Sequence, residues 1–282
     1  MIDTHCHLHF RAYDDDRDEV IARMRERHVR AITIGTNKET SQGAVELASK
    51  HSDMWCTVGL HPAHTHRATL HADAQETVDV GVEAFDDAYR ALAVSSQKVV
   101  AIGEVGLDYY RLPEGAMARE VKHAQEEALK GAIALANACS LPLVLHVRDA
   151  HARMQEILHD EIAGGNLKRR GVVHCFTGTQ EEALAYHALG FLTSFTGIVT
   201  FSDKKHPEQL TAIQHVALTV PLSMMMLETD APYLAPEPHR GKRNEPVYVC
   251  EVAAKIAQLK GVSIEEVESA TDENAEKLFT LR

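Results

Sequence analysis

The 282-residue sequence has no apolar stretch that approaches the roughly 20 residues of a membrane-spanning helix, so we expect no membrane partner. Met1–His7 lacks the basic segment followed by an apolar core that marks a secretory signal. The cysteines are scattered without a C-x-x-C pair, which argues against a disulfide framework and suits a reducing compartment. These absences predict a cytoplasmic protein. The five cysteines are Cys6, Cys56, Cys139, Cys175 and Cys250.

Positive charge is also scarce, because 29 Lys and Arg face 41 Asp and Glu and leave a net charge of −12. A basic surface is the usual electrostatic signature of nucleic-acid-binding proteins, and it is missing here. The acidic balance argues against tight non-specific DNA binding. It does not exclude a nuclease, because two divalent ions in a cleft supply local positive charge.

Short apolar runs alternate with helical patterns along the whole chain. Strands buried on both faces have this composition, and their alternation with helices predicts parallel pairing through right-handed crossovers. About eight such units make a single TIM (β/α)8 barrel over residues 1–282, with slight distortion allowed. An open doubly wound sheet is the alternative, but no G-x-G-x-x-G follows the first run. No repeat or linker interrupts the pattern, and Gly164–Asn166 fits a loop between a helix and a strand.

The predicted strands are Ile2–His5, Ala31–Gly35, Trp55–Gly59, Val99–Gly103, Leu143–His146, Gly171–His174, Leu192–Gly197 and Ser223–Leu227. The predicted helices are Arg17–His28, Thr40–His51, Ala74–Ser95, Arg119–Cys139, Ala150–His159, Glu181–Leu189, Glu208–Val216 and Pro246–Leu259.

Side chains typical of metal ligands stand at the ends of these strands. His5 and His7 are two apart, so a strand points both to the same face. An isolated H-x-H is more often a polar pair in a solvated loop, and His9 falls beyond the strand and is left out. Further ligand-type residues follow apolar runs at the carboxyl-terminal face, where barrel enzymes place their chemistry. They are Glu104, His146, His174 and Asp230.

Four imidazoles and two carboxylates suit Zn, Mn, Fe or Mg, and we expect two divalent ions, Mg, Mn or Zn. Ions about 3.5–4 Å apart, bridged by Glu104, would hold a phosphoryl oxygen and lower the pKa of a bridging water. Asp230 would act as general base. Cys6 and Cys175 point the opposite way on their strands and are expected to pack.

The motifs carrying these residues resemble those of the TatD family of metal-dependent deoxyribonucleases. The resemblance runs from end to end and implies a TIM barrel of the amidohydrolase superfamily that hydrolyses DNA, often as a 3′-to-5′ exonuclease. It assigns the same six residues to the metals. The matching strings are Ile2–His7, Gly59–Pro62, Gly103–Tyr109, Leu145–Arg148, His174–Gly178, Glu228–Leu234 and Arg240–Pro246.

The resemblance also places His61 and Arg148 against substrate phosphate. His61 can instead cap or pack, and Arg148 can instead pair with a neighbouring carboxylate. Glu228 and Asn244 are weaker candidates for orienting water or substrate. Two segments depart from the family by being extended, His61–His71 and Ala72–Gln97, which bears on substrate preference.

The basic cluster Arg240, Lys242 and Arg243 is expected to grip the DNA backbone, although such clusters are usually solvated faces. The partner is then DNA, single-stranded or at an exposed end, with little dependence on base sequence because phosphate contacts carry none. Exo and endo cleavage remain open, as does the oligomeric state, for which a monomer is the expectation.

Two other functions compete with the nuclease. The same metals can activate water against carbon, in an amidohydrolase acting on a small amide, lactone or ester, or on an aminoacyl ester of tRNA. Many binuclear amidohydrolases bridge their metals with a carboxylated lysine at the fourth strand, where this sequence has Glu104. A metal-binding interaction protein without activity is the second rival, against which the intact set of ligands argues.

Overall fold

Eight parallel strands pair in sequence order, β1 to β8, in the computed structural model, which describes residues 1–69, 76 and 81–281. Sequential parallel order with a helix after nearly every strand makes a TIM barrel, as predicted. The strands are β1 Ile2–Cys6, β2 Arg30–Thr33, β3 Met54–Val58, β4 Val99–Asp108, β5 Leu143–Arg148, β6 Gly171–Val173, β7 Leu192–Phe195 and β8 Met225–Leu227.

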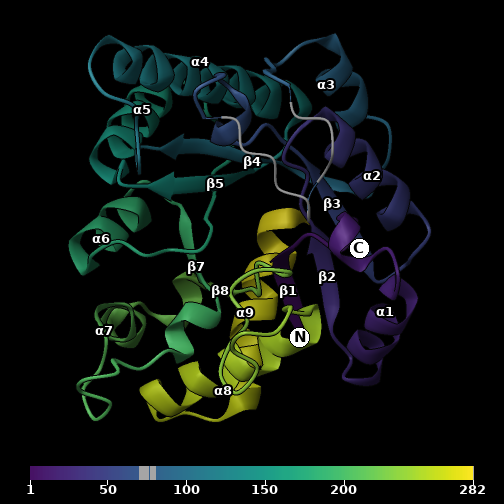
Figure 1. Ribbon diagram of the computed structural model, residues 1–282, viewed down its shortest axis with the longest axis vertical. Coiled ribbons are helices and arrows are strands. Elements are labelled where there is room, and N and C mark those ends of the chain that lie inside the picture. Colours follow the sequence, from purple (N-terminus) through teal and green to yellow (C-terminus); the bar gives the residue numbers. More distant parts are fainter. Residues whose placement is uncertain (70–75, 77–80, 282) are drawn as a thin grey trace.

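Helices surround the strands, and the chain runs round the barrel from α1 to α9 (Figure 1). They are α1 Arg17–Glu26, α2 Lys38–Ser49, α3 Asp87–Ala93, α4 Ala116–Cys139, α5 His151–Ala163, α6 Gln180–Ala188, α7 Ala212–Thr219, α8 Val249–Lys260 and α9 Ile264–Phe279. None of the described helices is both long and apolar enough to cross a membrane.

The two faces of each strand belong to two separate cores. One face packs against the helices, as Cys56, Leu145 and Met225 do. The other face fills the barrel interior, where Trp55, Val144 and Met226 meet. Because both faces are buried, the sequence of each strand is a nearly continuous run of apolar residues.

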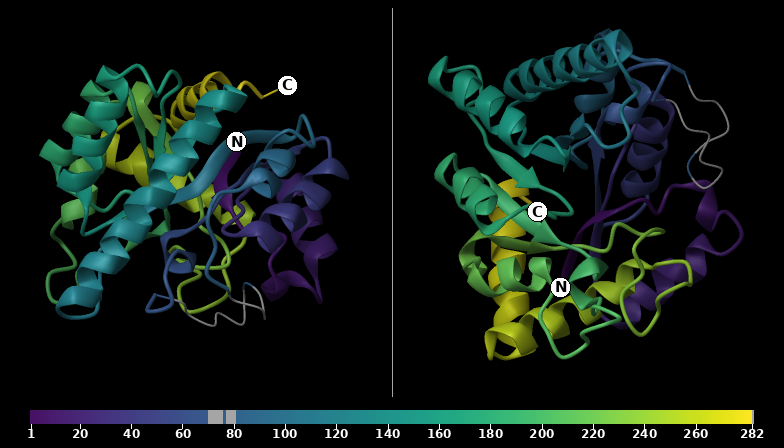
Figure 2. Two further views of the ribbon diagram at one scale, coloured as in Figure 1. Left: turned by 90° about the horizontal axis from the view of Figure 1, so that it is seen from above. Right: turned by 60° about the vertical axis from the view of Figure 1, so that its left-hand side comes forward.

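Helix α9 closes the amino-terminal end of the barrel. Its Phe279 belongs to the interior core, and its Glu268 accepts a hydrogen bond from the Met1 amine (2.6 Å). Asp272 accepts another from the Ile2 backbone (2.7 Å). These contacts bring the N- and C-terminal segments to the same side of the molecule (Figure 2).

The barrel is nearly closed, with its irregular seam between β1 and the segment after β8. A single bridge joins Cys6 to Ala231 there, and the Asp230 amide donates to the carbonyl of His5 (2.8 Å). The slight distortion allowed by the sequence therefore lies where three of the predicted metal ligands meet.

The predicted elements are found with two notable exceptions. The helix predicted over Ala74–Ser95 is wrong for residues 81–86, which are not helical. In the described part of this range the helix is α3. Residues 74, 75 and 77–80 lie outside the described residues. Much of the extended segment around His71 lies outside them too. The sequence pattern also missed α9, whereas the Gly164–Asn166 loop is found between α5 and β6.

Candidate metal centre

The six predicted metal ligands meet at the carboxyl-terminal end of the barrel. They come from β1, β4 and β5, directly follow β1 and β6, or lie three residues past the end of β8. Parallel strands end at one rim, so residues distant in sequence become neighbours there. Each has a nitrogen or oxygen within 3.6 Å of another in the set: His5, His7, Glu104, His146, His174 and Asp230.

Glu104 stands between two groups of these side chains. Its Oε1 lies 2.8 Å from His146 Nδ1 and 2.8 Å from His174 Nε2. Its Oε2 faces the other way, 3.4 Å from His5 Nε2. A carboxylate with each oxygen turned to a different set of imidazoles has the geometry of a bridging ligand.

The second group gathers around Asp230. Its Oδ1 lies 3.4 Å from His7 Nε2 and 3.6 Å from His5 Nε2. His7 donates from Nδ1 to the carbonyl of Ile34 (2.8 Å), which leaves the lone pair of Nε2 directed at the centre. This side of the site therefore offers two imidazoles and two carboxylates.

The donor set fits divalent cations. Both ring nitrogens of His5 are fully buried and have no hydrogen-bond partner among the described residues, which is costly unless another ligand binds them. Three overlapping groups have ligand atoms within 4.8 Å of one another. They are His5–His174–Asp230, His5–His7–Glu104 and His61–Glu104–His146.

The Glu104 carboxylate is ionised although it is buried. Burial disfavours its charge, but the facing histidines, His174 first, outweigh burial and hold the pKa of Glu104 well below its usual range. Burial likewise opposes the charge of His174, yet Glu104 raises the pKa of this imidazole well above its ordinary value. A cation bound here therefore competes with the proton that His174 otherwise holds.

The imidazoles of His5 and His61 are neutral. Burial, followed by the charge of His174, lowers the pKa of His5. Burial lowers the pKa of His61 to about 3. Neutral imidazoles are the form that binds metals.

Two carboxylates lie next to the outer nitrogens of the histidines, and Asp108 forms a hydrogen bond with one of them. Asp108 Oδ2 lies 3.3 Å from His146 Nε2, so Nε2–H points at this carboxylate and Nδ1 faces Glu104. Glu228 Oε1 lies 3.5 Å from His174 Nδ1 and accepts from the Cys175 amide (2.6 Å). Such partners fix the tautomer and orientation of metal-binding histidines.

Sequence reasoning did not identify Asp108 or Asp3. Asp108 is four residues past Glu104 in β4, so both lie on one face, and this spacing was the available signal. Asp3 is fully buried and accepts hydrogen bonds from the amide and hydroxyl of Thr229 (2.9 and 2.6 Å). It thereby fastens the segment before Asp230 to β1.

The site opens into a cavity of about 560 Å³. His7, Glu104, His146, His174 and Asp230 line it. Apolar side chains complete the wall, namely Phe10, Ile198 and Leu234. A concave site with a few convergent polar groups on apolar walls is the usual form of a substrate pocket.

Comparison with known proteins decides the family. The family model described as TatD related DNase matches residues 2–280. This chain belongs to the TatD family. The resemblance stated from the motifs is thereby confirmed.

Its TatD relatives carry the names of metal-dependent hydrolases. The chain is 36% identical over 282 residues to the uncharacterized metal-dependent hydrolase YabD of Bacillus subtilis, covering 100% of this chain and 99% of that protein. It is 37% identical over 288 residues to the 3′-5′ ssDNA/RNA exonuclease TatD of Cronobacter sakazakii, covering 99% and 97%.

Solved TatD structures share the fold. The TatD homologue YjjV of Escherichia coli K12 superimposes with a TM-score of 0.81 at 27% identity, covering 100% of this chain and 98% of that chain. A TatD family hydrolase of Entamoeba histolytica gives 0.79 at 22% identity, covering 100% and 98%, and supports the fold alone. The chain is a metal-dependent hydrolase on a TIM barrel.

The expected phosphate contacts of this TatD site lie in the cavity wall. His61 Nδ1 accepts from the Ala63 amide (3.1 Å) as a cap, while Nε2 lies 3.5 Å from Glu104 Oε1. His61 can therefore cap the turn through Nδ1 and still present Nε2 to the cavity. Arg148 is exposed over the Tyr110 ring, 3.6 Å from its centroid, and no described carboxylate lies within ion-pair distance. Its alternative role in a salt bridge is not observed.

Asn244 and the basic cluster are placed differently. Asn244 is fully buried and does not line the cavity; it donates to the carbonyls of Thr229 (2.9 Å) and Tyr233 (2.6 Å). Its amide holds the loop after β8, and its expected role toward water or substrate stays a prediction.

Within that cluster, Arg243 pairs with Asp16 (2.6 Å). Arg240 is exposed and lies over the Phe201 ring, 4.2 Å from its centroid. Lys242 is exposed as well. Arg240 and Lys242 are therefore the members of the cluster that face solvent most openly.

Proposed function

We propose that this chain hydrolyses phosphodiester bonds in DNA, at single strands or exposed ends, with two divalent ions. The observation that carries the proposal is the Glu104 carboxylate, whose two oxygens face two different sets of ligands. One ion would be held by His5, His7, Asp230 and Glu104, the other by Glu104, His146 and His174. Mg, Mn and Zn all suit these donors.

Divalent cations bound there supply Lewis acidity that offsets phosphate charge and lowers the pKa of water. The protein contributes the proton acceptor. Burial raises the pKa of Asp230, but the facing histidines, His7 first and then His5 and His174, together outweigh burial, and the pKa lies below its usual value. Asp230 is therefore ionised at neutral pH, and it lines the cavity.

The reaction then needs no covalent intermediate with the protein. Water oxygen bonds to phosphorus, and the bond between phosphorus and the 3′ oxygen of the remaining strand breaks. The proton of the attacking water passes to Asp230, and the departing oxygen takes up a proton from Asp230 or from solvent. Arg148 and the Nε2–H of His61 orient the phosphate from the cavity wall.

Phosphodiesters in nucleic acid are favoured over small amides and esters on two grounds. A close relative is named a 3′-5′ ssDNA/RNA exonuclease, which supports the same direction of digestion here. Among the described residues no lysine lines the cavity, so nothing takes the place of the carboxylated lysine of other amidohydrolases. Cleavage of an aminoacyl ester on tRNA is an outcome to be tested rather than a second proposal.

The test is hydrolysis of end-labelled single- and double-stranded DNA with Mg, Mn or Zn by wild type, Glu104→Ala and Asp230→Asn. We expect metal-dependent release of nucleotides from the 3′ end by wild type and its loss, by at least about 100-fold, in both variants. Asp160→Asn, which changes a carboxylate on the exposed face of α5, is the matched control and should cleave normally. Cleavage that survives both site substitutions contradicts the proposal, as does turnover only of amide or aminoacyl-ester substrates.

A further inference from the structure

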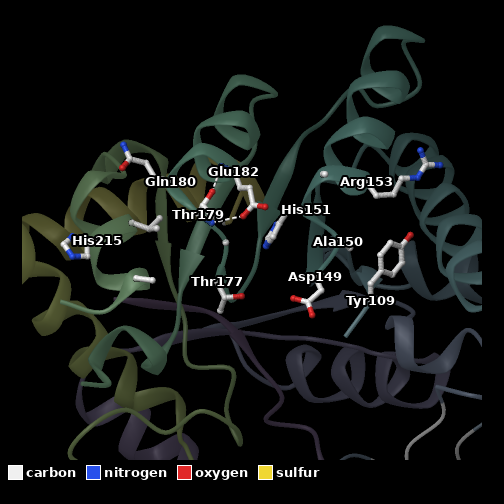
Figure 3. A pocket seen from close by; sticks show the side chains of 14 residues that line it. Tyr109, Asp149, Ala150, His151, Arg153, Thr177, Thr179, Gln180, Glu182 and His215 are labelled. Atoms are coloured by element: carbon white, nitrogen blue, oxygen red, sulfur yellow. Dashed lines mark hydrogen bonds between the residues drawn. The ribbon is translucent and has the colours of Figure 1, made fainter. Parts of the chain in front are cut away.

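A second cavity, of about 790 Å³, opens beside the metal centre. It lies between the first turns of α5, α6 and α7, and Thr177 lines both cavities. In Figure 3, His151 stands between α5 and α6 with Thr177 and Asp149 below it, so polar groups surround the space. None of the residues discussed above as metal ligands lines this cavity.

The loops that form the second cavity are continuations of the loops that form the first. Strand β5 carries His146 and Arg148 at the first cavity and leads directly to Asp149 at the second, and the segment after β6 runs from His174 to Thr177 and Thr179. The second cavity therefore adjoins the metal centre on the side of Thr177, where a chain-like substrate can continue from one cavity into the other.

The charges of this cavity disfavour a second phosphate. Asp149 and Glu182 add negative charge to its wall. Its one lining cation, Arg153, is held by Glu126 (2.7 Å) and Glu156 (3.0 Å). An anionic occupant would have to break these pairs or lie against carboxylates.

The remaining lining groups suit a neutral, hydrogen-bonding occupant. Gln180 and Thr177 are exposed, and no hydrogen bond ties their side chains to the described residues. His151 is engaged through Nδ1 with the Tyr186 hydroxyl (3.1 Å), so Nε2 remains free toward the cavity. Burial lowers the pKa of His151 and keeps it neutral.

We propose that this cavity binds the nucleoside adjacent to the phosphodiester that is cleaved, with its base between α5 and α6. The proposal rests on the proposed function, because it supplies a binding site for the unit next to the reacting phosphate. A nucleoside is neutral and carries hydrogen-bond donors and acceptors. Its base also has flat apolar faces, which can pack against Ala150, Ala152 and Val216 in the wall. The volume lies in the range of small-molecule sites.

The test narrows the cavity without touching the metal centre. Ala152 and Ala212 are exposed helical residues on opposite walls, so Ala152→Leu/Ala212→Leu reduces the space and is tolerated by α5 and α7. Ala134→Leu/Ala138→Leu makes the same two changes at exposed positions of α4, outside both cavities, and is the matched control.

Binding is measured in Mn²⁺ with a fluorescein-labelled pentathymidylate whose central linkage is a non-hydrolysable methylenephosphonate, together with a copy that has abasic sites beside this linkage. We expect wild type to bind the intact strand roughly 10-fold more tightly than the abasic one, in line with the contribution of one base. The narrowed variant, Ala152→Leu/Ala212→Leu, should lose most of this preference for the intact strand. The α4 control, Ala134→Leu/Ala138→Leu, should keep it.

An equal preference in wild type and the narrowed variant overturns the proposal, as does a wild type that binds both strands alike or neither. Because the measurement does not depend on turnover, it separates the two proposals. The wild-type protein can prefer the intact strand, and Ala152→Leu/Ala212→Leu can lose this preference, even if neither protein cleaves DNA. That result supports the proposed nucleoside site and contradicts the nuclease function.

Discussion

At the scale of single residues, the site depends on how carboxylates hold imidazoles. Glu104 faces His146, His174 and His5, while Asp108 lies behind His146. Each of these histidines has a ring nitrogen that faces a carboxylate of the site. The side chains of the site thus position one another.

Asp108→Ala should weaken divalent metal binding about 10- to 100-fold, because His146 loses the partner that orients its ring. The change is read by titrating the metal-free protein with Zn²⁺ or Mn²⁺ in competition with a chelating dye. Asp108→Asn still accepts a hydrogen bond and should lose less. Unchanged affinity in Asp108→Ala would show that His146 needs no support.

Metal affinity should rise with pH in the neutral range. Burial opposes protonation of His174, but Glu104 raises its pKa well above the ordinary value of about 6.5, so the metal-free site retains this proton at neutral pH. Raising the pH through the raised pKa frees the imidazole, and lowering it favours the proton over the ion. Calorimetry in two buffers of different ionisation enthalpy should detect released protons; affinity that is independent of pH between about 6 and 9 contradicts this assignment.

The ligand set could be predicted from the sequence because each ligand ends an apolar run. His146 and Glu104 interrupt strands that are otherwise buried, and such interruptions are costly without a partner. Asp108 was missed because the predicted strand ended at Gly103, whereas β4 continues to Asp108. For Asn244, the sequence alone does not distinguish a polar side chain that faces substrate from one that binds the backbone.

At the scale of elements, β4 and β5 form the pair that carries Glu104 and His146. Gly106 pairs with His146 and has φ of 153°. A Cβ added at Gly106 would lie 1.9 Å from the carbonyl oxygen of His146. Only glycine therefore allows the close approach of these strands at the site.

Gly106→Ala should lower the free energy of unfolding by about 2–4 kcal/mol and weaken metal binding, because the strands must separate. Gly43→Ala is the matched control: in α2 its Cβ would meet His9 at an ordinary 3.5 Å. It should be neutral or stabilise by up to about 1 kcal/mol. Urea denaturation of both variants measures the difference, and equal stability of the two would contradict the steric argument.

Strands were easier to predict than the connections between them. Buried strands have a distinctive composition, but residues 81–86 carry apolar side chains at helical spacing without forming a helix. Asp86 caps α3 by accepting from the amides of Ala88 and Tyr89, so the helix begins only after it. For α9 the pattern is mostly polar, and its few apolar residues gain meaning only against the end of the barrel.

At the scale of the whole molecule, stability and chemistry occupy opposite ends of the barrel. The carboxyl-terminal rim holds the site and the irregular seam, while α9 closes the other end with Phe279. The parallel order of all eight strands follows from the alternation of elements in the sequence. How the last segment closes the barrel depends on contacts across the full length of the chain and is not visible locally.

Phe279→Ala should destabilise the metal-free protein by about 3–5 kcal/mol, because it removes a large side chain from the barrel interior. Metal affinity of the folded protein should stay within about 2-fold, since the site lies at the other rim. Ile264→Ala, at an exposed position of α9 (44% exposed), should change stability by no more than about 0.5 kcal/mol. A parallel loss of metal affinity in Phe279→Ala would show that the two ends are coupled.

The most direct measurement of the central claim adds Mn²⁺ stepwise to the metal-free protein and follows both bound metal and nucleotide release from single-stranded DNA. We predict that activity appears with the second ion and reaches its plateau at about two ions per chain, and that Glu104→Ala shows neither the plateau nor the activity. Turnover without added metal, or a fully active Glu104→Ala variant, would contradict the claim that this carboxylate joins two catalytic ions.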